Sequence, residues 1–226
     1  MKKAYIIVGL GYGDEGKGLT TDYLCMHSSE PIVIRYNGGQ QAGHTVVTNN
    51  EVHVFSNFGA GTFRGVPTYW SSYCTFSPNY FIEEFGELSV KPKLYLDFFC
   101  SITTHYDVLY NRALEDSRGD KRYGSCGVGF GATVTRHQEL STKIIARDLL
   151  DLNIVKAKLK KVREYYRSKI EQETNYNFSD FDHDTEDRQF EIAVEKLNDL
   201  MISGFLIPKK FRNDRECSGP SRLICN

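Results

Sequence analysis

The stretch AYIIVGLGYGDEGKGLTT, residues 4–21, decides the fold class of this 226-residue chain. Its first part, residues 5–8, is a β-branched and aromatic run of the kind that forms a buried strand. Five glycines follow between residues 9 and 18, and residues 19–26 can then form a helix. A strand, a glycine-rich turn and a helix N-terminus together bind anions, because backbone N–H groups converge there and the missing Cβ atoms let a phosphate approach. The stretch predicts a phosphate-binding turn; a tight turn that binds nothing is the alternative.

The turn departs from the usual phosphate loop at one position. Residues 11–17 fit the spacing G-x-x-x-x-G-K, but Gly18 stands where a serine or threonine would ligate magnesium. Within the loop only Asp14 and Glu15 offer the hard anionic oxygens that magnesium prefers. The sequence therefore predicts a relative of the phosphate loop with a carboxylate in the loop itself. An unrelated phosphate-loop kinase is disfavoured by Gly18 and because no partner aspartate is visible on a later strand.

Length and composition indicate an ordinary globular protein. The 226 residues are enough for one domain or one and a half, and 40% of them are hydrophobic. The net charge of −1 argues against general affinity for nucleic acid or an anionic membrane, and no apolar run approaches the roughly 20 residues of a membrane span. The six cysteines form no C-x-x-C pair, and no cleavable signal follows the N-terminus. We therefore expect a cytoplasmic protein with reduced thiols and no zinc.

Two further loops are rich in polar residues and glycine. Residues 31–36, PIVIRY, form an apolar strand that runs into residues 37–45, which contain three glycines, three amides and a histidine. Such a loop lies at the C-terminal end of a strand, where α/β folds bind ligands. Residues 118–133 form a second glycine-rich loop with basic residues. A mobile surface loop is the alternative there, but beside the first site it is a credible second phosphate-binding segment.

Hydrophobic patterns place the remaining elements. We expect a hairpin over residues 46–55 that turns at Asn49 and Asn50, strands at residues 93–99 and 205–207, and helices at residues 79–85, 105–115, 148–173 and 188–201. The acidic run of residues 179–187 is expected to be a solvated linker, in which His183 is not a metal ligand. Together these elements predict an α/β fold with a mainly parallel central sheet and a helical segment at about residues 148–203.

Three motifs carry a resemblance to a known family. GYGDEGKG at residues 11–18 and RYNGGQQAGHT at residues 35–45 resemble the signature loops of the adenylosuccinate synthetases. Residues 122–133 resemble that family's later glycine-rich loop, which usually has two threonines before its first glycine. The resemblance runs from residue 4 to about residue 207 and is nearest to the shorter, atypical branch of the family.

The resemblance implies a reaction in two steps and a role for each residue. GTP phosphorylates O6 of IMP, and the amine of L-aspartate then displaces that phosphate. Asp14 matches the base that takes the N1 proton of the purine, and it also matches the magnesium ligand, with the backbone carbonyl of Gly43 as the second protein ligand. His44 matches the general acid that stabilises charge on the transferring phosphoryl group. The implied cofactors are Mg²⁺ and GTP, and the implied assembly is a homodimer.

The resemblance also implies the binding residues. The GTP phosphates would be held by Gly13, Asp14, Glu15, Gly16, Lys17, Gly18 and Leu19, with further contacts from Gly43, His44 and Thr45. Glu15, Gly16, Gln41 and Ala42 would line the IMP pocket. Ser125 and Cys126 would hold the IMP phosphate in place of the family's paired threonines. A thiol is a weaker donor than a hydroxyl, so Cys126 departs from the family pattern. Arg136 and Arg147 are candidates for the arginine that reaches across the dimer.

Several parts of the family pattern are not found in this sequence. Residues 1–207 read as the N-terminal part of a synthetase domain, and residues 208–226 as an irregular tail. A GAQG-type strand and loop for IMP, an arginine-rich loop for aspartate and an aspartate that reads guanine are not visible. We therefore expect no ligase activity from these residues alone. The alternatives are a phage-type synthetase that uses dGMP and a non-catalytic nucleotide-binding remnant.

The tail itself suggests a shifted reading frame. One permitted codon string for residues 211–223, FRNDRECSGPSRL, gives LEMIESAQGLLD when it is moved by one base. That peptide resembles the missing GAQG segment at the position where it is due. We therefore expect the chain from about residue 210 onward to be extended or disordered.

Overall fold

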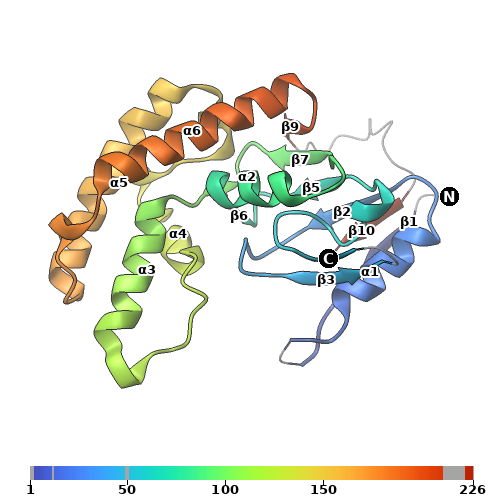
Figure 1. Cartoon of the computed structure of the whole chain (residues 1–226), viewed down its shortest axis with the longest axis horizontal. Coiled ribbons are helices and arrows are strands. Elements are labelled where there is room, and N and C mark those ends of the chain that lie inside the picture. The colour runs from blue at the N-terminus through green and yellow to red at the C-terminus, as the bar shows by residue number, and fades with distance from the viewer. Residues whose placement is uncertain (1–2, 12, 49–50, 211–221, 226) are drawn as a thin grey trace.

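The computed structural model describes residues 3–11, 13–48, 51–210 and 222–225. Figure 1 shows a parallel sheet at one end of the molecule and a group of helices at the other. Six strands, each parallel to its neighbours, form the sheet in the order β1-β10-β2-β5-β7-β9. Their bounds are β1 Lys3–Ile6, β10 Arg222–Cys225, β2 Pro31–Arg35, β5 Thr68–Trp70, β7 Leu94–Asp97 and β9 Leu206–Lys209. The predicted α/β fold with a parallel central sheet is confirmed.

Four short strands lie outside this sheet. They are β3 His44–Val47 and β4 Val52–Phe55, which pair antiparallel, and β6 Thr75–Phe76 and β8 Ser101–Ile102, which pair parallel. The β3–β4 pair confirms the predicted hairpin, and its predicted turn at Asn49 and Asn50 lies outside the described residues.

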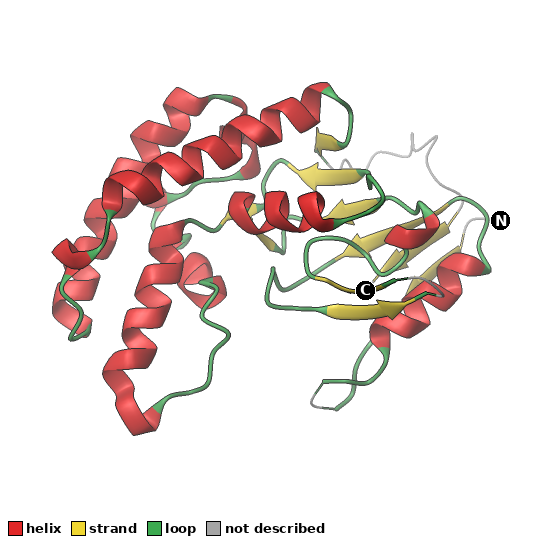
Figure 2. Ribbon diagram, viewed as in Figure 1, coloured by secondary structure: helices red, strands yellow, loops and turns green. Residues whose placement is uncertain are grey.

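The helices are drawn in red in Figure 2, and they agree with the apolar periodicity of the sequence. The α-helices are α1 Lys17–Met26, α2 Pro78–Glu87, α3 His105–Arg118, α4 Phe130–Arg136, α5 Leu152–Glu173 and α6 His183–Ile202. Short 3₁₀ turns lie at Thr62–Arg64, Gly119–Lys121, Leu140–Thr142, Ala146–Leu150 and Phe178–Asp180. None of the helices within the described ranges is both long and apolar enough to cross a membrane.

The main core lies between one face of the sheet and the helices. Trp70, Leu94 and Leu96 from the strands are fully buried in one cluster with Phe81 and Phe85 of α2. Helices α5 and α6 bury one stripe each in the same cluster and lie side by side (Figure 1). A smaller cluster under α1 joins Cys25, Val33 and Val66.

A buried ion pair connects three helices in the helical part. Asp107 of α3 and Arg136 of α4 have no exposed side-chain surface, and the guanidinium Nε lies 2.9 Å from the carboxylate Oδ1. The hydroxyl of Tyr166 on α5 donates to the same carboxylate oxygen at 2.7 Å. Arg136 also donates to the backbone carbonyls of Ile102 and Thr142. Arg136 is therefore committed inside the fold, and the suggestion that it reaches across a dimer is wrong; Arg147 is exposed.

Three local expectations need correction. β1 was expected to be buried, but it is the outer strand of the sheet and the side chain of Ile6 is 76% exposed. The acidic run was expected to be a linker, but α6 begins inside it at His183, and the Asp182 side chain caps the helix by accepting from the N–H of Thr185. Asp187 in the same run contacts His105 of α3 at 2.9 Å. An acidic residue in the first turn of a helix is favoured by the helix dipole, which explains why a charged run folds here.

The third correction concerns the C-terminal residues. They were expected to be extended or disordered from about residue 210, but Arg222–Cys225 forms β10, which pairs with β1 on one side and β2 on the other. Residues 211–221, on which most of the shifted-frame reading depends, lie outside the described residues. The predicted strand at residues 205–207 is confirmed as β9.

Candidate functional site

The loop between β1 and α1 has the backbone conformation of a ligand-binding turn. Gly13 and Gly16 have φ of 108° and 70°, and Asp14 between them has φ of 51°. Few residues other than glycine adopt this left-handed conformation, although aspartate does so more often than most. The backbone therefore turns sharply at Asp14 and leaves its carboxylate exposed. Strained backbone of this kind often marks a functional position.

A carboxylate occupies the centre of this loop. Glu15 accepts a short hydrogen bond from the N–H of Gly11, and its other oxygen lies 3.2 Å from Nζ of Lys17. The hydrogen bond from Gly11, followed by that from Lys17, lowers the pKa of Glu15. A Cβ atom at Gly9 would lie 2.0 Å from this carboxylate, so any other residue there would displace the Glu15 side chain. The backbone and Lys17 therefore form an anion site, and Glu15 supplies the anion.

The structure explains the departure from the phosphate-loop motif at Gly18. Gly18 lies in the first turn of α1, and a Cβ atom there would be 3.0 Å from Cβ of His44 and 3.4 Å from the carbonyl oxygen of Thr45. The start of β3 therefore occupies the space that a serine or threonine side chain would need. This contact brings the two sequence motifs together, and it places His44 and Thr45 next to Lys17.

Arg35 fixes the shape of the polar loop that follows β2. Its guanidinium is buried and donates to the carbonyl oxygens of Ala42 at 2.8 Å and Phe58 at 3.2 Å. The guanidinium carbon also lies 5.1 Å from the ring centre of Trp70, within the range of a cation–π contact. The carbonyl of Ala42 is thus fixed immediately before Gly43 and His44. Arg35 stands in the second motif, but no local pattern predicts this role, because its partners are up to 23 positions away.

The imidazole of His44 is neutral at physiological pH. Burial, reinforced by the positive charges of Arg35 and Lys17, lowers its pKa to about 4. A neutral imidazole can still donate one N–H to an anionic oxygen. His44 is therefore suited to donate a hydrogen bond to a phosphoryl group, and it carries no charge of its own in this state. Its role as the general acid stays a prediction.

The polar loop also contacts the second glycine-rich loop. Nε2 of Gln40 donates to the carbonyl oxygen of Val128 at 2.9 Å, although the two residues are 88 positions apart. A Cβ atom at Gly39 would lie 3.2 Å from the ring of Phe130, the first residue of α4. Next to this junction, Oε1 of Gln41 is buried and has no hydrogen-bond partner within the described part of the chain. A buried amide oxygen without a donor is suited to a ligand that brings an N–H or O–H group.

The second glycine-rich loop is anchored to α3. Glu115 accepts from the N–H groups of Gly124 and Ser125 at 3.0 Å and 3.4 Å. The hydroxyl of Ser125 accepts from Asn111 at 3.0 Å, and Cys126 is an exposed free thiol. These contacts favour an ordered loop over the alternative of a free surface loop. They place Ser125 and Cys126 on the α3 side of the molecule, whereas Val128 marks the point where the loop reaches Gln40.

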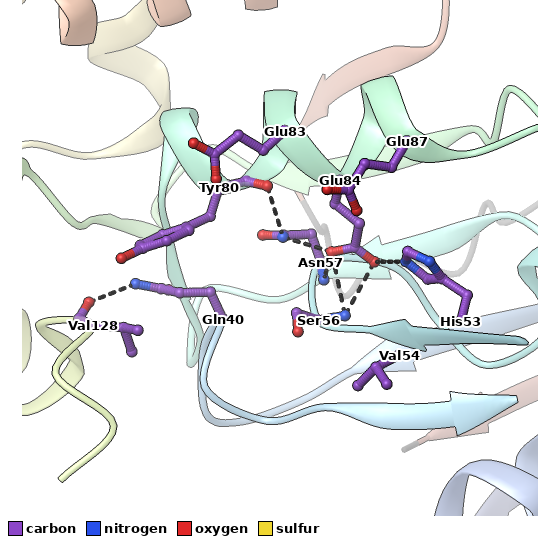
Figure 3. A pocket seen from close by; sticks show the side chains of 10 residues that line it. All are labelled: Gln40, His53, Val54, Ser56, Asn57, Tyr80, Glu83, Glu84, Glu87 and Val128. Atoms are coloured by element: carbon purple, nitrogen blue, oxygen red, sulfur yellow. Dashed lines mark hydrogen bonds and ion pairs between the residues drawn. The ribbon is translucent and has the colours of Figure 1, made fainter.

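A cavity of about 200 Å³ lies behind the polar loop (Figure 3). None of the predicted site residues lines it, and its walls include three glutamates: Glu83, Glu84 and Glu87. The negative charge of these glutamates disfavours the binding of a phosphate in this cavity. Glu84 is buried there and accepts from the N–H groups of Ser56 at 3.0 Å and Asn57 at 2.6 Å. Glu84 therefore holds the end of β4, whose Phe55 pairs with His44 across the hairpin. No local sequence pattern predicts this contact.

The described residues contain no cluster of three or more His, Cys, Asp or Glu side chains able to hold a metal. The predicted magnesium ligands fit that result, because they are one carboxylate, Asp14, and one backbone carbonyl, that of Gly43. Both are hard oxygen donors, and magnesium commonly completes its coordination with waters and substrate phosphates. Asp14 and the Gly43 carbonyl thus stay the predicted ligands of a magnesium ion held jointly with a nucleotide.

Solved structures support the fold. The fully ligated adenylosuccinate synthetase of Plasmodium falciparum superposes with a TM-score of 0.73 at 19% identity, over 99% of this chain and 51% of that one. A cyanophage S-2L succinoaminodeoxyadenylate synthetase, bound to dGMP and dATP, superposes with a TM-score of 0.60 at 14% identity, over 99% of this chain and 50% of that one. At these low identities, the two TM-scores show a shared fold and nothing more.

Sequence comparison establishes the family. The chain is 30% identical over 176 residues to the adenylosuccinate synthetase of Histophilus somni strain 129Pt, which is 75% of this chain and 40% of the relative. It is 28% identical over 221 residues to that of Edwardsiella ictaluri, which is 94% of this chain and 50% of the relative. The chain therefore spans about half the length of these relatives. The family model for adenylosuccinate synthetase matches residues 6–215, and the chain belongs to the adenylosuccinate synthetase family.

Proposed function

We propose that this chain supplies the phosphoryl-transfer half of an adenylosuccinate synthetase, which binds GTP, Mg²⁺ and IMP and ligates L-aspartate to IMP once the remaining groups are present. The contact between Gly18 and His44 carries the proposal, because it joins the phosphate loop to the second signature motif. A simple tight turn would need neither the anion site around Lys17 nor the close approach of His44. The proposal extends to the family's cytoplasmic location and homodimeric assembly.

Each residue then has a chemical task. In the substrate complex, phosphate oxygens of GTP replace the Glu15 carboxylate beside Lys17 and the N–H of Gly11. Asp14 takes the N1 proton of IMP, so that O6 becomes nucleophilic. Asp14 and the Gly43 carbonyl would hold magnesium, which would neutralise phosphate charge when bound.

His44 and Gln41 complete the arrangement. Neutral His44 donates a hydrogen bond to the phosphoryl group as charge develops on it. The free Oε1 of Gln41 accepts from the purine. Arg35 holds the backbone between these two residues through the carbonyl of Ala42.

Calorimetric titration with GTP and with IMP, each with and without Mg²⁺, tests the proposal on the chain itself. We expect magnesium-dependent binding of GTP that Lys17→Ala weakens at least about tenfold, a loss of about 1.4 kcal/mol. Lys161→Ala is the matched control, because Lys161 is an exposed lysine on α5. No GTP binding, or equal binding by Lys17→Ala and the parent, would contradict the proposal. Adenylosuccinate formed by the 226-residue chain alone would contradict its division into two halves.

The same titration distinguishes between IMP and dGMP, the two candidate nucleotide substrates. The cyanophage enzyme was solved with dGMP, and its TM-score to this chain, 0.60, is lower than the 0.73 of the Plasmodium enzyme. We expect IMP to bind more tightly than dGMP. The opposite order would favour a phage-type synthetase, and nucleotide binding without turnover in the presence of the missing half would favour a non-catalytic remnant.

A further inference from the structure

The cavity behind the polar loop is acidic and lies apart from the predicted nucleotide-binding residues. Its walls come from β4 and the residues that follow it, from α2, and from one residue of each polar loop (Figure 3). Three of the lining residues are the glutamates Glu83, Glu84 and Glu87 of α2, and the described residues that line the cavity include no lysine or arginine. The cavity therefore carries a net negative charge.

The positions of these glutamates are unfavourable for α2 itself. Glu83 and Glu87 are four positions apart and Glu84 and Glu87 are three apart, so like charges are neighbours on the helix surface. Each such pair costs about 0.2–0.5 kcal/mol. The last turn of α2 holds no basic residue, although the helix dipole favours cations there. Lys91, beyond the helix, donates to backbone carbonyls at the helix end. A cation bound in the cavity would offset the repulsion among the glutamates.

The three carboxylates differ in how far the protein satisfies them. Glu84 is buried, and Nε2 of His53 lies 3.4 Å from its Oε1. Glu84 also accepts the backbone N–H groups at the end of β4. Glu83 and Glu87 are exposed, and neither has an ion-pair partner within the described residues. The cavity thus has one carboxylate that the fold uses and two that are open to a ligand.

A buried amide oxygen at the same cavity lacks a hydrogen-bond donor. The Asn57 side chain is 1% exposed, and its Nδ2 donates to Oε2 of Glu84 at 2.7 Å and to the carbonyl oxygen of Tyr80 at 3.2 Å. Both amide hydrogens are used, so Oδ1 is left as an acceptor. Oδ1 has no partner within the described part of the chain, and in Figure 3 it points toward the side of the cavity where Tyr80 and Gln40 lie. A buried acceptor of this kind is suited to a ligand N–H group.

We propose that this cavity binds a small organic cation whose charged group carries several N–H donors, namely a guanidinium or primary ammonium ion. One N–H group donates to Oδ1 of Asn57, and the charge is balanced by Glu83 and Glu87. The ring of Tyr80 offers a face for a cation–π contact. A metal ion fits less well, because the described residues contain no cluster able to hold one. A ligand that carries a carboxylate of its own would be repelled. The proposal does not depend on nucleotide binding.

Calorimetric titration of the 226-residue chain with agmatine tests the proposal. Agmatine carries a guanidinium group and a primary ammonium group, and it has no carboxylate. We expect binding that the double variant Glu83→Gln/Glu87→Gln weakens at least about tenfold. Glu139→Gln/Glu171→Gln is the matched control, because it removes the same charge from exposed glutamates in the helical part. Equal weakening by the two double variants would reduce the effect to net charge and overturn the proposal.

Probes on the parent chain separate recognition of N–H groups from attraction of charge. Tetramethylammonium is a cation without an N–H group, so we expect it to bind at least about tenfold more weakly than agmatine. In NMR spectra, agmatine is expected to shift the backbone amide resonances of Ser56 and Asn57. No binding of agmatine, equal binding of tetramethylammonium, or shifts confined to residues 9–17 would overturn the proposal. Mg²⁺ that shifted Ser56 and Asn57 in the same way would also overturn it, because the site would then be a metal site.

Discussion

The helical part of the molecule and the phosphate-loop end of the sheet treat charged groups in opposite ways. In the helical part, Asp107 and Arg136 satisfy each other at zero exposure, and Tyr166 completes the pair. At the phosphate-loop end, Asp14 is exposed on a left-handed turn, and the ion-pair partner of Lys17 among the described residues is the Glu15 carboxylate of its own loop. A group that is satisfied inside the fold contributes to stability, whereas a group left open to solvent can bind a ligand. Substitutions in the two regions should therefore separate stability from function.

The largest effect is expected at Asp14. In the assembled enzyme, Asp14→Asn removes both the general base and the charged magnesium ligand, and the loss of general base catalysis alone lowers kcat by about 10²–10⁴-fold. The melting temperature should stay near that of the parent, because Asp14 is exposed. Steady-state kinetics and a thermal melt measure the two quantities. A variant within tenfold of the parent in kcat would remove Asp14 from the mechanism.

Asp107 should show the opposite behaviour. Asp107→Ala leaves the buried Arg136 charge without its partner, which costs about 3–5 kcal/mol of unfolding free energy. Tyr166→Phe is the control, because it removes only one hydroxyl from the same carboxylate and should cost about 1 kcal/mol. Denaturant titration compares the two variants. Equal losses would show that the ion pair does not dominate this cluster.

The same pair predicts a pH dependence. Burial by itself raises the pKa of Asp107, but the charge and hydrogen bonds of Arg136 hold it below its ordinary value of 3.8. Because the folded pKa is the lower one, the contribution to stability is complete above pH of about 4 and is lost as the pH falls through the folded value. The free energy of unfolding of the parent should therefore fall more steeply below pH 4 than that of Asp107→Ala.

Sequence reasoning succeeded where the signal is local. Apolar periodicity predicted α5 and the β3–β4 hairpin, and glycine spacing predicted the turn before α1. It failed where the deciding contact joins distant residues. The carboxylate that pairs with Arg136 lies 29 positions away, so nothing near Arg136 in the sequence indicates burial. β1 has the composition of a central strand, and only the strand order shows that it is an edge.

The candidate site shows the same difference between features with a local signal and features that depend on distant contacts. Both motifs can be recognised in the sequence, but their contact at Gly18 depends on how β3 packs against α1. Glu84 and Gln40 act through partners 28 and 88 positions away, which no local pattern reveals. Asp182, by contrast, is a residue type that often caps a helix, and acidic residues follow it in the first turn, so these two signals could have found the true beginning of α6.

Gly18→Ser sharpens the comparison with an ordinary phosphate loop. The substitution restores the residue type that the common motif requires, but the new side chain would meet His44 at about 3 Å. Overpacking of this kind costs about 1–3 kcal/mol, and it should also displace His44 from Lys17. We expect weaker magnesium-dependent GTP binding by Gly18→Ser, whereas Gly131→Ser, at a glycine with open space around its Cβ position, should bind as the parent does. Tighter GTP binding by Gly18→Ser would show that β3 yields and that a hydroxyl ligand is accepted.

The smallest effect is expected at Gln40, whose hydrogen bond to Val128 joins the regions on either side of the comparison. Gln40→Ala removes the neutral hydrogen bond to Val128 and a long one, at 3.5 Å, from the hydroxyl of Thr75. A neutral hydrogen bond is worth about 0.5–1.5 kcal/mol, so the melting temperature should fall by only a few degrees. Its effect on binding should be selective. The carbonyl of Val128 belongs to the loop that carries Ser125 and Cys126, so its release should weaken IMP binding while GTP binding stays within a factor of two. Gln138→Ala, at an exposed glutamine just after α4, is the control, and it should leave the binding of both nucleotides unchanged. If Gln40→Ala weakened GTP binding and IMP binding equally, the contact between Gln40 and Val128 would support the whole site and would not serve only to position the second glycine-rich loop.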